Sequence, residues 1–133
     1  MKRSYFLIVT AVLEAVTGLV LLIIPEALLK LLFGDRAATP VLIVYGRFYG
    51  AVLLAFSVAC WFVRNQHGTT RLHGFTLAAL LYDVVAAILL ALLGLAYGMI
   101  GLLLWPAVAA HILLGGWGIL CIRANNARPV RRS

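Results

Sequence analysis

Four ionisable side chains, Glu14, Arg47, Asp83 and His111, lie one in each of four long apolar stretches. A charge at the centre of a bilayer costs from about 2.5 to more than about 10 kcal/mol, depending on the reference state. Such residues therefore face the interior of a bundle or pair with one another. Two acids, a base and a histidine could bind a polar group, carry a proton or perform acid–base chemistry.

The charges of this set do not cancel. Arginine stays protonated, so Arg47 neutralises one carboxylate. The second carboxylate must then hold a proton, or His111 must be charged, because an unpaired charge is costly in lipid. The sequence thus predicts a cluster that holds one exchangeable proton.

Helical spacing places small or polar residues on the same faces as the four ionisable groups, as expected for close helix–helix contacts in lipid. Arg47 follows Pro40 by seven residues, so it starts about 10 Å below one surface and its long side chain can reach the midplane. We therefore expect all four groups to meet at one ligand or proton site. The residues expected to support this site are Thr10, Thr17, Tyr45, Tyr49 and Thr76.

The elements that must position these groups are transmembrane helices. The chain has 133 residues, is 65% hydrophobic and has a mean hydropathy of +1.09, whereas a soluble domain is nearer half apolar. A helix needs about 20 apolar residues to cross the hydrocarbon core, and the runs lack the alternation of barrel strands. The prediction is one all-α domain over 1–133, an up-down-up-down four-helix transmembrane bundle. Its spans are 5–24, 41–63, 72–92 and 99–122.

The segment between the first two spans has its own helix signals. Pro25 suits a first turn, Glu26 and Lys30 are spaced as an i,i+4 ion pair, and Gly34 favours a stop. We expect a short interfacial helix over 25–33. In the fourth span, Pro106 predicts a kink.

Basic residues predict the orientation. Only Lys30 and Arg36 would lie on the outer side of the bundle, so the positive-inside rule predicts that both termini are cytoplasmic. The predicted location is a bacterial-type inner membrane. The basic tail 123–133 then sets topology, and the chain carries no nucleic-acid-binding motif. The residues on the inner side would be Lys2, Arg3, Arg64, Arg71, Arg123, Arg128, Arg131 and Arg132.

No cofactor and no metal site is predicted. Cys60 and Cys121 fall near cytoplasmic helix ends, where thiols stay reduced, and they lack further ligands at useful spacing. The expected partners are the lipid bilayer and either further copies of the chain or a larger membrane complex.

The order Gly18, Pro25 and Gly34, followed by Arg47-Phe48-Tyr49-Gly50, resembles the small bacterial four-helix membrane proteins of the DoxX-like type over the first half of the chain. This resemblance implies a fold and a topology rather than an activity. The mid-helix Glu14 is also similar to the glutamate of small multidrug resistance transporters, which exchanges protons for cationic drugs. Arg47 and Asp83 depart from that family, and an internal arginine would repel a cation.

Three functions stay open at this point. The leading one is a non-enzymatic membrane protein whose cluster binds a small amphipathic ligand or a partner membrane subunit. A proton-coupled transporter working as an oligomer is the second, and a membrane-embedded enzyme using the carboxylate and histidine groups is the third. Against all of them stands a structural role, in which buried polar contacts only fix helix register.

Overall fold

A computed structural model describes residues 3–66 and 70–126. These residues form five α-helices and one 3-10 turn, and none of them lies in a strand. Lys2 and the tail beyond 126, which entered the orientation argument, lie outside these ranges. The elements are α1 (Arg3–Ile23), α2 (Pro25–Phe33), η1 (Asp35–Ala37), α3 (Pro40–Val63), α4 (Thr70–Leu95) and α5 (Leu104–Asn126).

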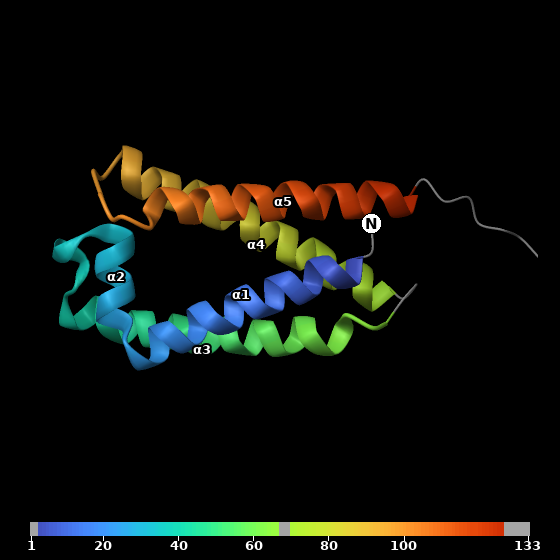
Figure 1. Ribbon diagram of the computed structural model, residues 1–133, viewed down its shortest axis with the longest axis horizontal. Coiled ribbons are helices and arrows are strands. Elements are labelled where there is room, and N and C mark those ends of the chain that lie inside the picture. Colours follow the sequence, from blue (N-terminus) through green and yellow to red (C-terminus); the bar gives the residue numbers. More distant parts are fainter. Residues whose placement is uncertain (1–2, 67–69, 127–133) are drawn as a thin grey trace, which may run out of the picture.

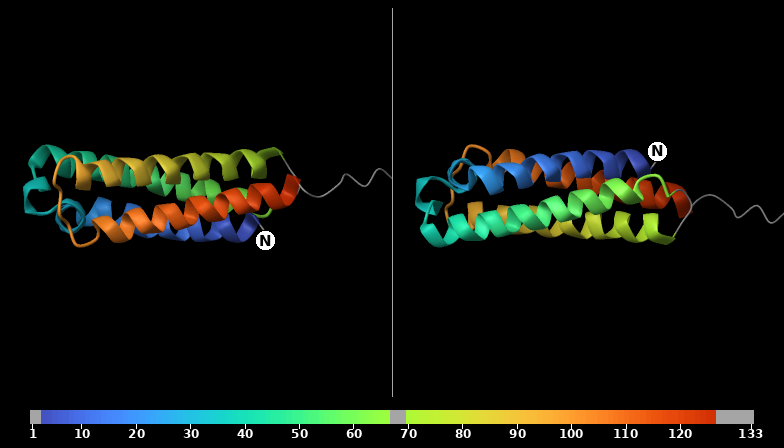
Figure 2. Two further views of the ribbon diagram at one scale, coloured as in Figure 1. Left: turned by 90° about the horizontal axis from the view of Figure 1, so that it is seen from above. Right: turned by 90° about the horizontal axis from the view of Figure 1, so that it is seen from below.

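The long helices associate as two pairs, α1 with α3 and α4 with α5 (Figure 1). The start of α1 and the end of α5 lie at one end of the molecule, and α2 lies at the other (Figure 2). All four long helices are long and apolar enough to cross a membrane. Their outer faces carry many large exposed apolar side chains, which a hydrocarbon environment would cover.

Glycines set the close crossing of α1 and α3. A Cβ at Gly18 would lie 2.8 Å from the carbonyl oxygen of Gly50, and a Cβ at Gly50 would lie 2.7 Å from that of Gly18. Only hydrogen fits at either position, because the neighbouring atoms are backbone. A further bond, from the Ser57 hydroxyl to the carbonyl of Ala11 at 2.7 Å, joins the same two helices.

The short helix over 25–33 is confirmed with the predicted bounds. Pro25 occupies its first turn, and Glu26 and Lys30 form an ion pair of 2.8 Å. Gly34 ends it with a φ of 86° and donates its N–H to the Lys30 carbonyl at 2.8 Å. The positive φ explains the need for glycine at this stop.

The fourth long helix starts later than the predicted 99–122. It begins at Leu104, because the preceding loop packs against α2, and the N–H of Leu103 donates to the carbonyl of Leu31 at 2.8 Å. Gly101 lies against the backbone of Leu32 and has no room for a side chain. Pro106 therefore falls in the first turn of α5, where a missing N–H breaks no helical bond, and the predicted kink was wrong.

The connected cluster of buried apolar residues that serves as the core lies on one side of the polar groups. Its members in α1 precede Glu14, those in α4 precede Asp83, and those in α5 follow His111. Beyond Asp83, no residue of α4 is buried. Further buried apolar residues lie on the α2 side of the polar groups, namely Leu21, Leu29, Leu104 and Val108. The core consists of Phe6, Leu7, Ala11, Cys60, Val63, Leu72, Ala79, Leu114 and Cys121.

Candidate functional site

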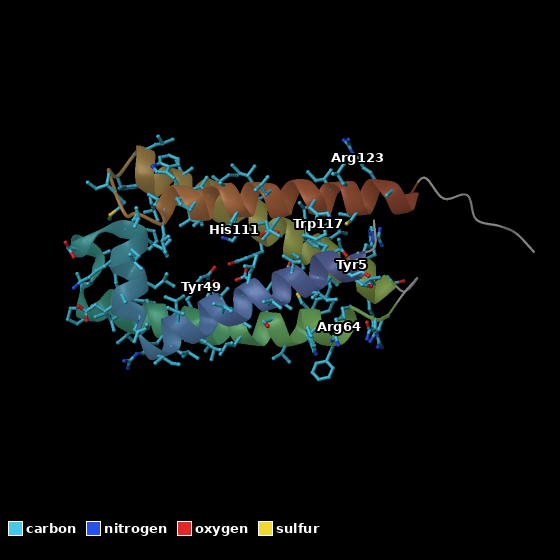
Figure 3. The ribbon with its side chains drawn as sticks, viewed as in Figure 1. Tyr5, Tyr49, Arg64, His111, Trp117 and Arg123 are labelled. Carbon is cyan, nitrogen blue, oxygen red and sulfur yellow. The ribbon has the colours of Figure 1, made fainter. Side chains whose placement is uncertain are left out.

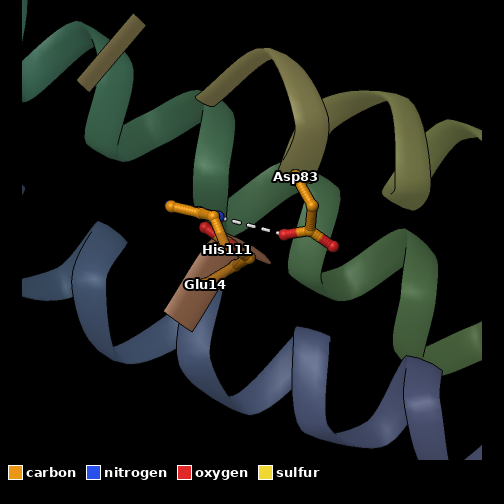
Figure 4. A group of neighbouring side chains, drawn as sticks. All are labelled: Glu14, Asp83 and His111. Carbon is orange, nitrogen blue, oxygen red and sulfur yellow. Dashed lines mark hydrogen bonds and ion pairs between the residues drawn. The ribbon is translucent and has the colours of Figure 1, made fainter. Parts of the chain in front are cut away.

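Three of the predicted groups meet in the middle of the bundle. Glu14 comes from α1, Asp83 from α4 and His111 from α5 (Figure 4). One donor atom from each lies within 4.8 Å of the others. The two carboxylates are 3% and 0% exposed, and His111 Nδ1 lies 3.0 Å from Asp83 Oδ1. The cluster therefore joins both helix pairs across the bundle.

Two tyrosines extend the cluster toward the surface. The Tyr82 hydroxyl donates to Glu14 Oε2 at 3.1 Å, and the Tyr49 hydroxyl donates to the Tyr82 hydroxyl at 3.3 Å. Tyr49, labelled in Figure 3, is 44% exposed, so this chain of hydrogen bonds connects an exposed phenol to a buried carboxylate. The ring of Tyr82 also packs edge-on to His111, with centroids 5.5 Å apart.

Tyr82 is the functional residue that sequence reasoning missed. It directly precedes Asp83, and a tyrosine hydroxyl inside an apolar span needs a partner. That requirement was a usable signal, but its partner on α1 lies 68 residues away.

Arg47 does not join the cluster, and the expectation that four groups meet was wrong for it. Its side chain is exposed and lines a groove with Glu26 and Lys30, beside α2. The buried residues of this part of α3 are Gly46 and Gly50, whereas Arg47 is exposed. Without the arginine, the described cluster contains two acids and one imidazole.

Of the residues predicted to support the site, some lie near the cluster and others do not. Tyr49 belongs to the hydrogen-bond chain, whereas Tyr45 is exposed and Thr17 is half-buried. Thr76 is buried but donates to the carbonyl of Leu72, one turn back in its own helix, at 2.7 Å. Thr10 is fully buried, and its hydroxyl has no hydrogen-bond partner among the described residues.

The electrostatics of the cluster favour a cation. Asp83 Oδ2 is buried and lacks a hydrogen-bond partner among the described residues. A buried carboxylate oxygen without a partner is costly unless a proton or another cation neutralises it. Two carboxylates and one imidazole in this space can therefore hold protons or bind a positive group.

The same donors could hold a divalent metal ion. Carboxylate oxygen and imidazole nitrogen bind zinc at about 2.0–2.2 Å, so donors of one ion lie roughly 3.5 Å apart. Separations of up to 4.8 Å between the donors of Glu14, Asp83 and His111 would have to shorten by about an ångström. The hydrogen bond from Tyr82 would then orient Glu14 as an outer partner of the ligand set.

Comparison with known proteins does not assign this chain to a family. No family model, no curated protein and no solved structure matches it.

Proposed function

We propose that this chain is a four-span membrane protein whose Glu14–Asp83–His111 cluster binds the cationic group of a small amphipathic ligand in exchange for protons. The observation that carries the proposal is the convergence of two buried carboxylates and an imidazole; among the described residues, neither carboxylate forms an ion pair with a lysine or arginine. An amphipathic cation would bring its apolar part from the hydrocarbon and place its charge at the cluster.

The hydrogen-bond chain supports entry from the side of Tyr49. The apolar core lies between the cluster and the start of α1, whereas the hydrogen-bond chain reaches an exposed tyrosine. The route that we propose for the ligand therefore runs past Tyr49 and Tyr82 to Glu14. This arrangement favours binding over passage through the bundle.

The topology proposed here is up-down-up-down, with both termini cytoplasmic in a bacterial-type inner membrane and α2 at the outer interface. It is supported by four helices of spanning length and by arginines near the end that holds the start of α1, including Arg64 and Arg123 (Figure 3). The proposal agrees with the resemblance to DoxX-like proteins. We also propose that the chain associates with further copies of itself or with a larger membrane complex.

Proton-coupled transport is the second candidate, and the position of Arg47 favours it. An arginine in the cluster would repel a cationic substrate, but Arg47 lies in the groove beside α2. Transport also requires an opening through the apolar core between the cluster and the start of α1, so it needs a second conformation of the bundle.

Calorimetric titration of the purified protein in a nonionic maltoside tests the proposal. The probe is tetraphenylphosphonium, and tetraphenylborate has the same shape with the opposite charge. We expect the cation alone to bind, with an affinity that rises about tenfold per pH unit where binding displaces one proton. Infrared carboxyl bands followed between about pH 5 and 9 should lose intensity on binding, since a carboxylic acid loses its proton.

Matched variants separate charge from folding. Glu14→Gln and Asp83→Asn should each lower the affinity for the cation at least tenfold. Asp35→Asn makes the same chemical change at an exposed acid in η1 and should have little effect. Equal binding of both probes, or binding that is insensitive to pH and to Glu14→Gln, would refute the proposal and leave the cluster a structural contact.

A further inference from the structure

A groove near the α2 end of the molecule lies outside the cluster. It is formed by the end of α1, by α2 and by the first part of α3, and it has a volume of about 450 Å³. Ligand pockets typically measure about 300–1,000 Å³. Its lining combines apolar residues with three charged ones and consists of Ile23, Ile24, Pro25, Glu26, Ala27, Lys30, Ile43 and Arg47.

The groove is lined by two basic residues and one acid, so one positive charge is not neutralised within it. Lys30 is paired with Glu26 at 2.8 Å; the hydrogen bond and then the charge of Lys30 hold the pKa of Glu26 below its ordinary 4.5. Glu26 raises the pKa of Lys30 in turn, so both groups stay charged and neutralise each other near neutral pH. Within the described residues, the guanidinium of Arg47 has no hydrogen bond or ion pair.

The position of Arg47 along α3 makes its unpaired positive charge important for ligand binding. It lies seven residues into α3, about 10 Å from the start of the helix, on a span of high hydropathy. An arginine there extends toward the interface, where its guanidinium can bind a phosphate through two parallel hydrogen bonds. The apolar groove walls, Ile23 and Ile43 among them, are suited to an acyl chain.

We propose that this groove binds an anionic phospholipid, with the headgroup phosphate on Arg47 and an acyl chain along the apolar lining. The charge of the site selects an anion, and the walls select an amphiphile over a free anion. The proposal is independent of the function of the buried cluster, which is formed by other residues, Glu14, Asp83 and His111.

Native mass spectrometry of the protein in mild detergent tests this site. The probes are phosphatidylglycerol and phosphatidylcholine with the same acyl chains, and inorganic phosphate. We expect phosphatidylglycerol to bind at least tenfold more tightly than phosphatidylcholine, and Arg47→Gln to remove that preference. Arg47→Lys should keep only part of it, because an ammonium cannot form the paired hydrogen bonds.

Two further variants distinguish the groove from general charge. Ala27→Trp fills the groove from an exposed position and retains Arg47, so it should also lower the affinity for phosphatidylglycerol. Arg123→Gln removes an exposed arginine at the opposite end and should change the affinity less than twofold.

Three results would overturn the proposal. One is equal affinity for both lipids in the wild type, and another is an unchanged preference in Arg47→Gln with retained helicity. The third is displacement of the lipid by millimolar inorganic phosphate, which would identify a site for a soluble anion.

Discussion

The contact between α1 and α3 predicts the effect of a single methyl group. In Gly50→Ala, the new Cβ would lie 2.7 Å from the carbonyl oxygen of Gly18 and 2.9 Å from Leu21 Cβ. Ordinary van der Waals contact begins near 3.4 Å, so the helices must separate by about 0.7 Å. Overpacking of this kind costs about 1–3 kcal/mol, and the higher helix propensity of alanine returns up to about 1 kcal/mol.

We therefore expect Gly50→Ala to lower the free energy of unfolding by about 1–2 kcal/mol. Titration of mixed micelles with SDS, followed by helical circular dichroism, measures this quantity. Glu14 lies one turn from Gly18, so the same variant should also weaken cation binding at the cluster. The contact thus links stability to the geometry of the site.

Gly116→Ala provides the matched control. It makes the same change in the interior of α5, where a Cβ would meet nothing within 4 Å. Its stability should stay equal or rise by up to about 1 kcal/mol. Equal stabilities for Gly50→Ala and Gly116→Ala would refute the reasoning, because the close crossing of α1 and α3 would then not limit the fold.

Two other predictions follow from the hydrogen bonds and charges. Tyr82→Phe should lower cation affinity more than Tyr49→Phe, because only Tyr82 donates to Glu14; equal losses in calorimetric titrations would contradict this order. The Glu26–Lys30 pair should stabilise α2 until the pH falls through the lowered pKa of Glu26 or rises through the raised pKa of Lys30. Thermal unfolding of wild type and Glu26→Gln against pH measures this, and curves that stay parallel at acidic pH would exclude a role for the pair.

The position of the core bears on how the cluster could work. Apolar side chains pack between Glu14 and the start of α1, and Arg3 and Cys121 join α1 to the end of α5 through a hydrogen bond of 3.5 Å. The other side is held by the contacts of α2 and by the loop that precedes Leu104. Contacts therefore hold the bundle together on both sides of the cluster.

Much of the helical architecture could be predicted from the sequence, since length and hydropathy are local properties. The bounds of the short helix over 25–33 follow from Pro25 and Gly34, whose backbone preferences need no tertiary context. The start of α5 could not be predicted in this way. The apolar residues from Met99 to Leu103 suit a helix, but contact with α2 holds them in a loop.

The sequence by itself determined which groups are costly to bury, and it therefore identified Glu14, Asp83 and His111, together with Arg47, as a set. Only the tertiary structure decided their partners. The sequence pattern of an apolar helix does not fix how the helix is rotated about its axis, so it does not tell which neighbour a given side chain faces. The close crossing of α1 and α3 places Gly50 against α1, and Arg47 lines the groove beside α2. Packing between the helix pairs brings Tyr82 to Glu14, and the cluster consists of two acids and one imidazole.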